Sequence, residues 1–253
     1  MNVIIFSKDR AMQLDAALAT LARYLSFPGT PIDVSVIYAF SNAAFGAGYT
    51  KLMSSRHAAW ILEENFREQV LAQLRLGPKY TMLYCDDCML FAPVIFSGLT
   101  GDVLCYAPSL GRNATISYPV SRTQSIPQDF PKWVYRSADA DFAYPWATTG
   151  HIYRTTDLYT ILRDRAWGSP NTLEASMVGA QSDHPYMTAP EWSCSVCIPH
   201  NMVQSNFPNR NEGGSTKELN DAFLAGARID PFAMDFSKVP AAHWPVPFVC
   251  KET

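Results

Sequence analysis

Hydrophobic residues in the first part of the chain alternate between the spacing of a strand and the spacing of a helix. An apolar run at residues 1–6 changes abruptly to polar residues 7–10, and apolar positions over residues 11–25 then recur with a period near 3.6. Residues 32–38 alternate as a second strand and lead to Ser41. This order predicts a right-handed strand–helix–strand unit, with the carboxyl ends of its parallel strands on one edge.

A third apolar run, at residues 80–84, ends in the adjacent carboxylates Asp86 and Asp87, and residues 89–91 then return to the core. In open α/β sheets, ligands bind at the carboxyl edge of the strands. Like charges held together need solvation or a cation, and hard carboxylate oxygens suit Mg²⁺ or Mn²⁺ shared with substrate phosphates. A strand-end turn is the alternative interpretation of the pair, because Asp favours turns and helix N-caps.

We expect the polar residues at the three strand ends to converge on one crevice, with Arg10, Tyr38 or Ser41, and the aspartate pair as its members. The rest of the pattern predicts, in order, mostly helix at 49–76, a short helix at 93–98, a strand at 103–106, a loop-rich segment at 114–146, a strand at 149–154 followed by a helix, a helix starting near 170, a strand at 194–198 and a capped helix from 215. No internal repeat or low-complexity linker interrupts this order, so we expect a single domain over residues 1–253.

Composition narrows the classes of protein. The 253 residues are 48% hydrophobic, enough for a packed core, while a net charge of −3 leaves no general electrostatic footprint for nucleic acid or an anionic membrane. The apolar opening is too short and too soon charged for a signal peptide, and no run reaches the length of a membrane span. We therefore expect a cytoplasmic protein with reduced thiols, without a nucleic-acid partner.

Two cysteine doublets have the spacing of metal ligands, Cys85 with Cys88 and Cys194 with Cys197. They are much further apart in the sequence than the doublets of ordinary zinc modules, and on a strand Cys85 and Cys88 would point to opposite faces. The pattern therefore favours core thiols, with a structural zinc site as the alternative.

Several motifs together resemble those of nucleotide-sugar glycosyltransferases with the GT-A fold, especially the family-two-like bacterial and viral kinds. They span most of the chain and occupy residues 6–14, 83–91, 109–113, 150–154, 169–174, 201–204 and 218–226. The resemblance implies an α/β, Rossmann-like, three-layer domain with a mostly parallel central sheet. Residues 1–106 would form the nucleotide-binding half and residues 107–253 the acceptor-side half.

The resemblance also implies a metal-dependent, inverting transfer from a nucleoside-diphosphate sugar to the hydroxyl of a carbohydrate or other acceptor. An Asp-x-Asp motif usually holds Mn²⁺ or Mg²⁺ in this family, but here Cys85 and Cys88 replace its outer residues on either side of the pair. The metal ligands expected are Asp86 and Asp87, with His200 as a candidate to complete the metal shell or contact the diphosphate, because neutral imidazole accompanies carboxylates at Mn²⁺. A surface or core histidine is the alternative reading of His200. The nucleotide-binding residues implied or expected are Ser7, Asp9, Arg10, Tyr38, Ser41, Asp86, Asn201 and Gln204, with Asn206 as a further amide candidate.

The transfer needs a base that takes the proton of the acceptor hydroxyl. Glu174 is our preferred base, because its segment resembles the family segment that presents such a carboxylate at a helix start. The alternative is that Glu174 only complements the helix dipole. Asp183 is the second candidate base, and an ordinary turn residue is its alternative reading. Sugar-stacking platforms are suggested by Trp133, Trp146 and Trp167, although each also fits a core.

Two other functions remain open from the sequence. A nucleotidyltransferase would also use aspartates and a divalent ion, but it normally carries a glycine-rich loop after its first strand, where this chain has none. A non-catalytic relative that binds carbohydrate or nucleotide would fit the altered Asp-x-Asp motif.

Overall fold

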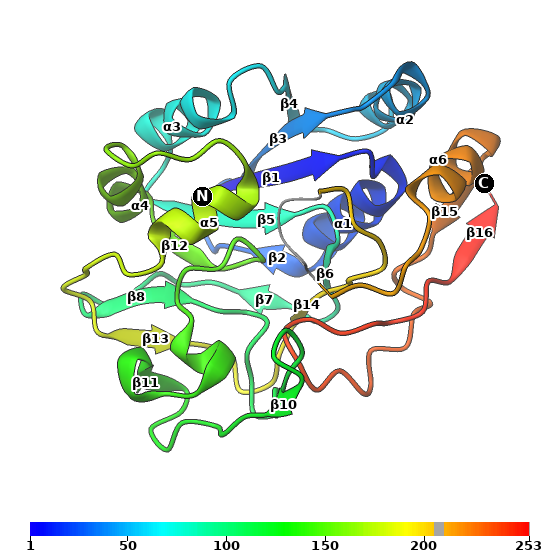
Figure 1. Ribbon diagram of the computed structural model, residues 1–253. Helices are drawn as coiled ribbons and strands as arrows, with labels where there is room; N and C mark the ends of the chain where they lie inside the picture. Colours follow the sequence, from blue (N-terminus) through cyan, green and yellow to red (C-terminus); the bar gives the residue numbers. More distant parts are fainter. Residues whose placement is uncertain (205–209, 253) are drawn as a thin grey trace.

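The computed structural model describes residues 1–204 and 210–252, and an eight-stranded sheet lies at its centre (Figure 1). The sheet has the strand order β11-β13-β8-β12-β5-β1-β3-β4. Only β12 and β11 run against their neighbours, so the sheet is mostly parallel, as predicted. Its strands are β1 (Asn2–Lys8), β3 (Asp33–Ala39), β4 (Ala59–Leu62), β5 (Tyr80–Cys85), β8 (Val103–Tyr106), β11 (Lys132–Val134), β12 (Ile152–Arg154) and β13 (Tyr186–Thr188).

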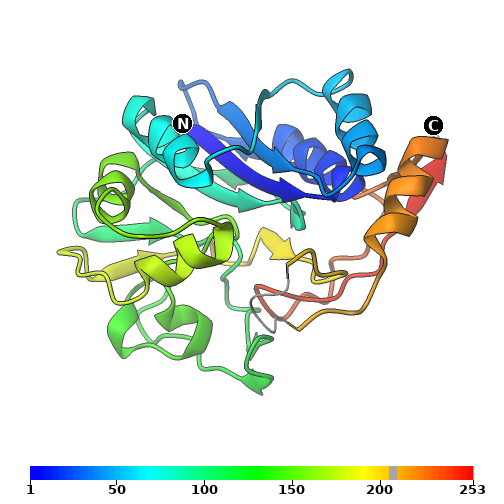
Figure 2. The same ribbon diagram turned by 45° about the horizontal axis from the view of Figure 1, so that its top comes forward.

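Helices cover both faces of the sheet, because the central strands are apolar on both sides. Val3 and Ile5 of β1 point into one core, and Ile4 and Phe6 point into the other. The first core includes residues of α1 (Ala11–Tyr24), α2 (Ala43–Met53) and α6 (Thr216–Ala225), and the second includes residues of α3 (Phe66–Leu76), α4 (Thr155–Leu162) and α5 (Pro170–Met177). The predicted three-layer α/β architecture is therefore confirmed. Figure 2 shows α6 beside α2, at the opposite end of the molecule from α3 and α4.

Short strand pairs complete the fold. The pair that matters for the site is β6 (Cys88–Leu90) with β14 (Ser195–Cys197), which starts directly after the aspartates. The other pairs are β2 (Leu25–Ser26) with β7 (Val94–Ile95), β9 (Ile116–Ser117) with β10 (Arg122–Thr123), and β15 (Ala227–Ile229) with β16 (Cys250–Glu252). Two 3₁₀ turns, η1 (Tyr135–Ser137) and η2 (Ala140–Ala143), lie in the predicted loop-rich segment.

Residues 49–76 are mostly helix, as predicted, in two segments, because α2 ends at Met53 and α3 begins at Phe66. The edge strand β4 lies between them, and its four residues are too few for an alternation to stand out between two helical patterns. The predicted helix at residues 93–98 is wrong, since Val94 and Ile95 pair with β2. A contact with a distant strand decides that structure, and local spacing does not report it.

The predicted strand–helix–strand opening is confirmed, with β1 and β3 in parallel register. Asp9 has a φ of 56°, a left-handed conformation that Asp adopts more readily than most residues, and it turns the chain from β1 into α1. Strands from both predicted halves share the central sheet. Among the described residues, no helix is both long enough and apolar enough to cross a membrane.

Candidate active site at the carboxyl edge of the sheet

The carboxyl ends of β1, β3 and β5 bring the predicted polar residues together. Asp9 follows β1, and both of its carboxylate oxygens accept hydrogen bonds from Ser41, one from the backbone N at 2.8 Å and one from the hydroxyl at 2.9 Å. Tyr38, near the end of β3, packs its ring 4.9 Å from that of Tyr49 between centroids. Asp86 follows β5, and its backbone N–H donates to the carbonyl of Phe6 on β1. The expected convergence at this edge is therefore observed.

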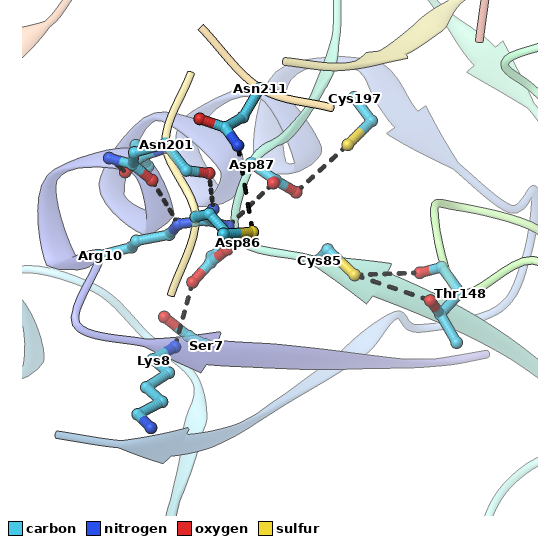
Figure 3. Close-up of polar contacts among 12 residues, drawn as sticks. Ser7, Lys8, Arg10, Cys85, Asp86, Asp87, Thr148, Cys197, Asn201 and Asn211 are labelled. Carbon is cyan, nitrogen blue, oxygen red and sulfur yellow. Dashed lines mark hydrogen bonds and ion pairs between the residues drawn. The ribbon is translucent and has the colours of Figure 1, made fainter. Parts of the chain in front are cut away.

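Arg10 lies at the centre of this group (Figure 3). Its Nη1 donates to Asp86 Oδ1 at 3.0 Å and to Asp87 Oδ2 at 2.8 Å, and its Nε donates to Asn201 Oδ1 at 2.7 Å. Its Nη2 donates to the Asn201 backbone carbonyl. Four of the five N–H groups of a guanidinium are thus committed to three residues that the sequence analysis selected. Asn201 is 191 residues from Arg10 in the chain, so only the tertiary fold joins them.

All four oxygens of the aspartate pair have protein donors. Beyond the two that Arg10 uses, Asp86 Oδ2 accepts from the backbone N of Lys8 at 3.2 Å, and Asp87 Oδ1 accepts from the Cys197 thiol at 3.3 Å. The repulsion between adjacent carboxylates is therefore offset by a shared cation and two further hydrogen bonds. Asp86 and Asp87 do form the turn between β5 and β6, as the alternative interpretation has it, but protein donors hold all four of their carboxylate oxygens.

Burial sets the electrostatics of the pair. Loss of solvent raises the pKa of Asp86 above its usual range, and the Arg10 guanidinium opposes that rise. Burial disfavours the charge on Arg10, but the carboxylates of Asp86 and Asp87 more than compensate and raise the pKa of Arg10. Arg10 therefore carries a permanent positive charge beneath the strand ends.

Glu174, the preferred base, lies on α5 and is held by residues that lead back to this edge. Its Oε1 accepts from the Tyr144 hydroxyl at 3.0 Å, and its Oε2 accepts from the backbone N and the hydroxyl of Thr148, both at 2.8 Å. The Cys85 thiol, at the end of β5, contacts the carbonyl of Thr148 at 3.6 Å. Hydrogen bonds through Thr148 thus connect Glu174 to the strand that carries the aspartates.

A cluster of thiols lies on the other side of Asp87. Cys88 and Cys197 are directly opposite each other in the β6–β14 pair, and their sulfurs with a carboxylate oxygen of Asp87 lie within 4.8 Å of one another. His243 forms a backbone bridge with Cys197. A hydrogen bond from Cys88, helped by the His243 imidazole, lowers the pKa of the Cys197 thiol, whereas burial raises the pKa of Cys88. We call Asp87, Cys88, Cys197 and His243 the thiol cluster.

The donor set around the aspartates fits Mg²⁺ poorly, because Mg²⁺ prefers an octahedron of oxygen ligands and Asp87 is flanked by thiols. Mn²⁺ tolerates sulfur somewhat better. Among the described residues, the potential metal-ligating group includes Asp87 but neither Asp86 nor His200. The ring of His200 packs on Phe248, and burial followed by the Arg10 charge lowers the pKa of His200, which favours neutral imidazole.

The remaining candidates fall in different places. Ser7 is buried, with its hydroxyl 2.7 Å from that of Tyr49. Gln204 is partly exposed, three residues beyond Asn201, and Asn206 lies outside the described residues. Asp183 is exposed before the amino end of β13, at the opposite edge of the sheet, so the fold does not bring it to the aspartates. The tryptophans suggested as platforms are core residues, all buried: Trp133, Trp146 and Trp167.

Sequence reasoning missed four residues that shape the site, namely Tyr49, Tyr144, Thr148 and His243. Tyr144 lies in the loop-rich segment without periodicity, Thr148 lies between that segment and the next predicted strand, and His243 lies close to the carboxyl terminus. Nothing in local spacing marks them, since each reaches the site only through tertiary packing. Cys197 was noted in its doublet, but its pairing with Cys88 depends on the register of β6 and β14.

Comparison with known proteins gives one informative sequence match. No family model matches the chain. The chain is 27% identical over 189 residues to the bifunctional glycosyltransferase pgtA of Dictyostelium discoideum, a match that covers 64% of this chain and 25% of that protein. The chain thus spans about a quarter of the length of the curated relative it matches.

Solved structures match the chain at low similarity. TarS of S. aureus has 15% identity, a TM-score of 0.40, and coverage of 75% of this chain and 34% of its own. The mannosyltransferase PcManGT of Pyrobaculum calidifontis, solved with GDP-Man and Mn²⁺, has 10% identity, a TM-score of 0.40, and coverage of 75% and 54%. The sequence match to pgtA supports the resemblance to glycosyltransferases that the motifs indicated, while the family-two-like assignment stays a prediction.

Proposed function

We propose that this chain is a glycosyltransferase that moves a sugar from a nucleoside-diphosphate sugar to an acceptor hydroxyl at the carboxyl edge of its sheet. One observation carries the proposal, namely that Arg10 joins Asp86, Asp87 and Asn201 in a buried polar group where ligands bind in open α/β sheets. The sequence match to a glycosyltransferase supports the reaction class.

The nucleotide is assigned to the Asp9 side of the edge. Each Asp9 oxygen accepts one bond from Ser41 and retains capacity to accept another, so the carboxylate can receive an N–H group of a base. Arg10 has most of its N–H groups committed to protein atoms. We therefore infer that Arg10 acts mainly by positioning Asp86, Asp87 and Asn201, and less by direct contact with the diphosphate than the sequence suggested.

Glu174 is assigned as the base. In a direct displacement, the acceptor oxygen forms a bond to the anomeric carbon as the bond to the diphosphate oxygen breaks, and the acceptor proton passes to a Glu174 oxygen. Three donors hold the carboxylate in one orientation, which suits a residue whose contribution depends on alignment. Attack from the face opposite the leaving group would invert the anomeric centre.

The predicted dependence on Mn²⁺ or Mg²⁺ is a separate part of this proposal. Asp87 would hold the ion, because its side chain is more exposed than that of Asp86, at 13% against 4%. Binding there requires that Arg10 or Cys197 give up a hydrogen bond to Asp87. When bound, such an ion would neutralise charge on the leaving diphosphate.

Calorimetry with UDP, GDP and their sugars tests the nucleotide site, with Mn²⁺, with Mg²⁺ and with a chelator. We expect binding of at least one nucleotide, weakened by about tenfold or more in Asp9→Asn, since a hydrogen bond to a charged group contributes about 1.5–3 kcal/mol. Asp183→Asn is the matched control at the opposite edge and should bind as the unaltered protein does.

The same titrations separate the parts of the proposal. Binding that is unchanged by the chelator would remove the metal dependence and leave the glycosyltransferase assignment standing. Binding without turnover of any nucleotide sugar would favour the non-catalytic relative. Absence of binding to every nucleotide and nucleotide sugar tested would overturn the proposed function.

A further inference from the structure

The proposed transfer gives no role to Cys88, Cys197 or His243 of the thiol cluster, yet these metal-ligating side chains come from three segments of the chain. Cys88 comes from β6, Cys197 from β14, and His243 from the segment that forms a bridge with Cys197. All cysteines of the chain are free thiols, and Cys88 and Cys197 are buried. Buried cysteines ordinarily pack as small apolar residues. The feature that calls for explanation is the carboxylate of Asp87, which lies within 4.8 Å of both sulfurs.

The distances match a tetrahedral site. Ligand sulfurs about 2.3 Å from a zinc ion lie about 3.8 Å from each other, and a carboxylate oxygen and a sulfur lie about 3.5 Å apart. Asp87 Oδ1 is 3.3 Å from Cys197 Sγ, and the three donor atoms lie within 4.8 Å of one another. Small side-chain movements, without a change in the backbone, therefore suffice to close this set around one ion.

His243 is the candidate for the fourth position of a tetrahedron. It forms a backbone bridge with Cys197, and its Nδ1 is buried without a hydrogen-bond partner in the part of the chain that the structure describes. Its ring nitrogens do not lie within 4.8 Å of all three of the other donors, so the ring must move to complete the set. A buried polar atom without a partner is costly, and a metal ion is one way to satisfy the ring.

We propose that Asp87, Cys88 and Cys197, with His243 as fourth ligand, form a binding site for a borderline or soft divalent ion of the Zn²⁺ class. Such a site is chemically distinct from a hard cation on the donor diphosphate, because thiolates select Zn²⁺ over Mg²⁺. Binding releases the thiol protons to solvent. The ion ties the turn that carries the aspartates to β14, and it leaves Asp87 Oδ2 and both oxygens of Asp86 with their present donors.

Cobalt is the most direct probe, because Co²⁺ bound by thiolates absorbs in the near ultraviolet and tetrahedral Co²⁺ absorbs in the visible. We expect the reduced full-length chain, stripped of metal, to take up about one Co²⁺ with both features, and Zn²⁺ to displace it. Excess Mg²⁺ should leave the spectrum unchanged. No nucleotide is present, so the outcome is independent of the proposed transferase activity.

Three variants test the ligands. Cys88→Ser and Cys197→Ser should each weaken Co²⁺ binding by at least about 100-fold. A change to a residue that only supports a ligand costs up to about 100-fold, and removal of a ligand itself should cost at least as much. Cys194→Ser is the matched control, because Cys194 belongs to the same doublet and is buried, but its thiol donates to the Trp192 carbonyl outside the cluster. It should keep the full spectrum.

A substitution in the core can prevent folding, so the unaltered chain provides a test of its own. Absence of thiolate-to-cobalt absorption in the reduced, folded protein would overturn the proposal. A spectrum that survives in both Cys88→Ser and Cys197→Ser, or that disappears equally in Cys194→Ser, would also overturn it. A Cys88–Cys197 disulfide that persists in the protein under reducing conditions would show that the two thiols serve another purpose.

Discussion

Both edges of the central sheet carry a cluster of charged residues, but the clusters are built differently. At the carboxyl edge, Arg10, Asp86 and Asp87 have side chains that are 8%, 4% and 13% exposed. At the amino edge, Arg154, Asp157 and His184 have side chains that are 16–26% exposed, and Arg154 and Asp157 are only three residues apart in the sequence. The first cluster is assembled by the tertiary fold, and the second is partly a local feature of the start of α4.

The difference in burial between the two clusters indicates which edge of the sheet is the better candidate for a functional site. An exposed pair is largely screened by water and contributes little, so it needs no special explanation. A buried arrangement of one cation with two anions has a large desolvation cost. A contribution to stability is therefore a weak explanation for its presence. The carboxyl-edge cluster is therefore the better candidate for a functional site, and the contrast with the amino edge can be tested directly.

Arg10→Ala should have the largest effect on stability. It leaves Asp86 and Asp87 buried side by side without their cation, and breaking a buried pair in this way costs about 3–5 kcal/mol. Chemical denaturation followed by fluorescence measures the free energy of unfolding. Arg10→Lys is the control, because it keeps the charge but not the forked geometry, and its loss should be smaller. If Arg10→Ala lowers the free energy of unfolding by less than about 1 kcal/mol, this cluster contributes no more to stability than an exposed pair does, and the contrast between the two edges is lost.

His151 gives the carboxyl edge a pH dependence. Burial lowers the pKa of His151 to about 4, below its ordinary value of 6.5. Between about pH 6.5 and about pH 4, His151 is protonated in the unfolded chain but neutral in the folded chain. The free energy of unfolding therefore decreases by about 2–3 kcal/mol as pH falls from about 6.5 to about 4. His151→Asn should lose less stability than the unaltered protein over that range. Parallel curves of unfolding free energy against pH for the two proteins would contradict the assignment.

Thr148→Val tests the support of the proposed base. The substitution removes the hydroxyl that donates to Glu174 Oε2 and keeps the backbone N–H that donates to the same oxygen. Loss of one donor to a charged group, about 1.5 kcal/mol, should lower kcat about tenfold with little change in KM. A rise in KM with unchanged kcat would mean that Thr148 serves binding and not alignment of the base.

Asp157→Asn should have the smallest effect. Asp157 pairs with Arg154 at 3.5 Å and with His184 at 3.3 Å, both partly exposed. We expect a loss of less than about 1 kcal/mol in the free energy of unfolding and no change in activity. A loss as large as that of Arg10→Ala would remove the distinction between the two edges.

Much of the carboxyl edge could be predicted from the sequence, because each apolar strand run ends in a polar residue and parallel strands share one edge. That reasoning is enough to bring Arg10, Ser41 and Asp86 together. It does not predict that Arg10 bridges both aspartates and Asn201, since a hydrogen bond depends on side-chain directions that spacing does not report. Asn201 was selected from its amide-rich stretch and from the resemblance, and neither indicates that it bonds to Arg10.

Other features of the molecule depend on long-range contacts that local spacing does not report. Asp183 is a candidate base in the sequence because it lies in a polar turn. The direction of β13 places it at the amino edge of the sheet, away from the aspartates. Cys88 and Cys197 are separated by more than a hundred residues in the sequence, and antiparallel register places them opposite each other. Register depends on partners from elsewhere in the chain. The spacing within one doublet therefore does not show that these two cysteines lie opposite each other.

The most direct test of the central claim is release of nucleoside diphosphate from a panel of nucleotide sugars. We expect the unaltered chain to cleave at least one, either by hydrolysis or by transfer to an added hydroxyl acceptor. Glu174→Gln should lower that rate by about 10²–10⁴-fold while nucleotide binding persists, and Asp183→Asn should leave it unchanged. Normal turnover in Glu174→Gln would contradict the assigned base. No turnover of any nucleotide sugar by the unaltered protein would contradict the account of this edge as a glycosyltransferase site.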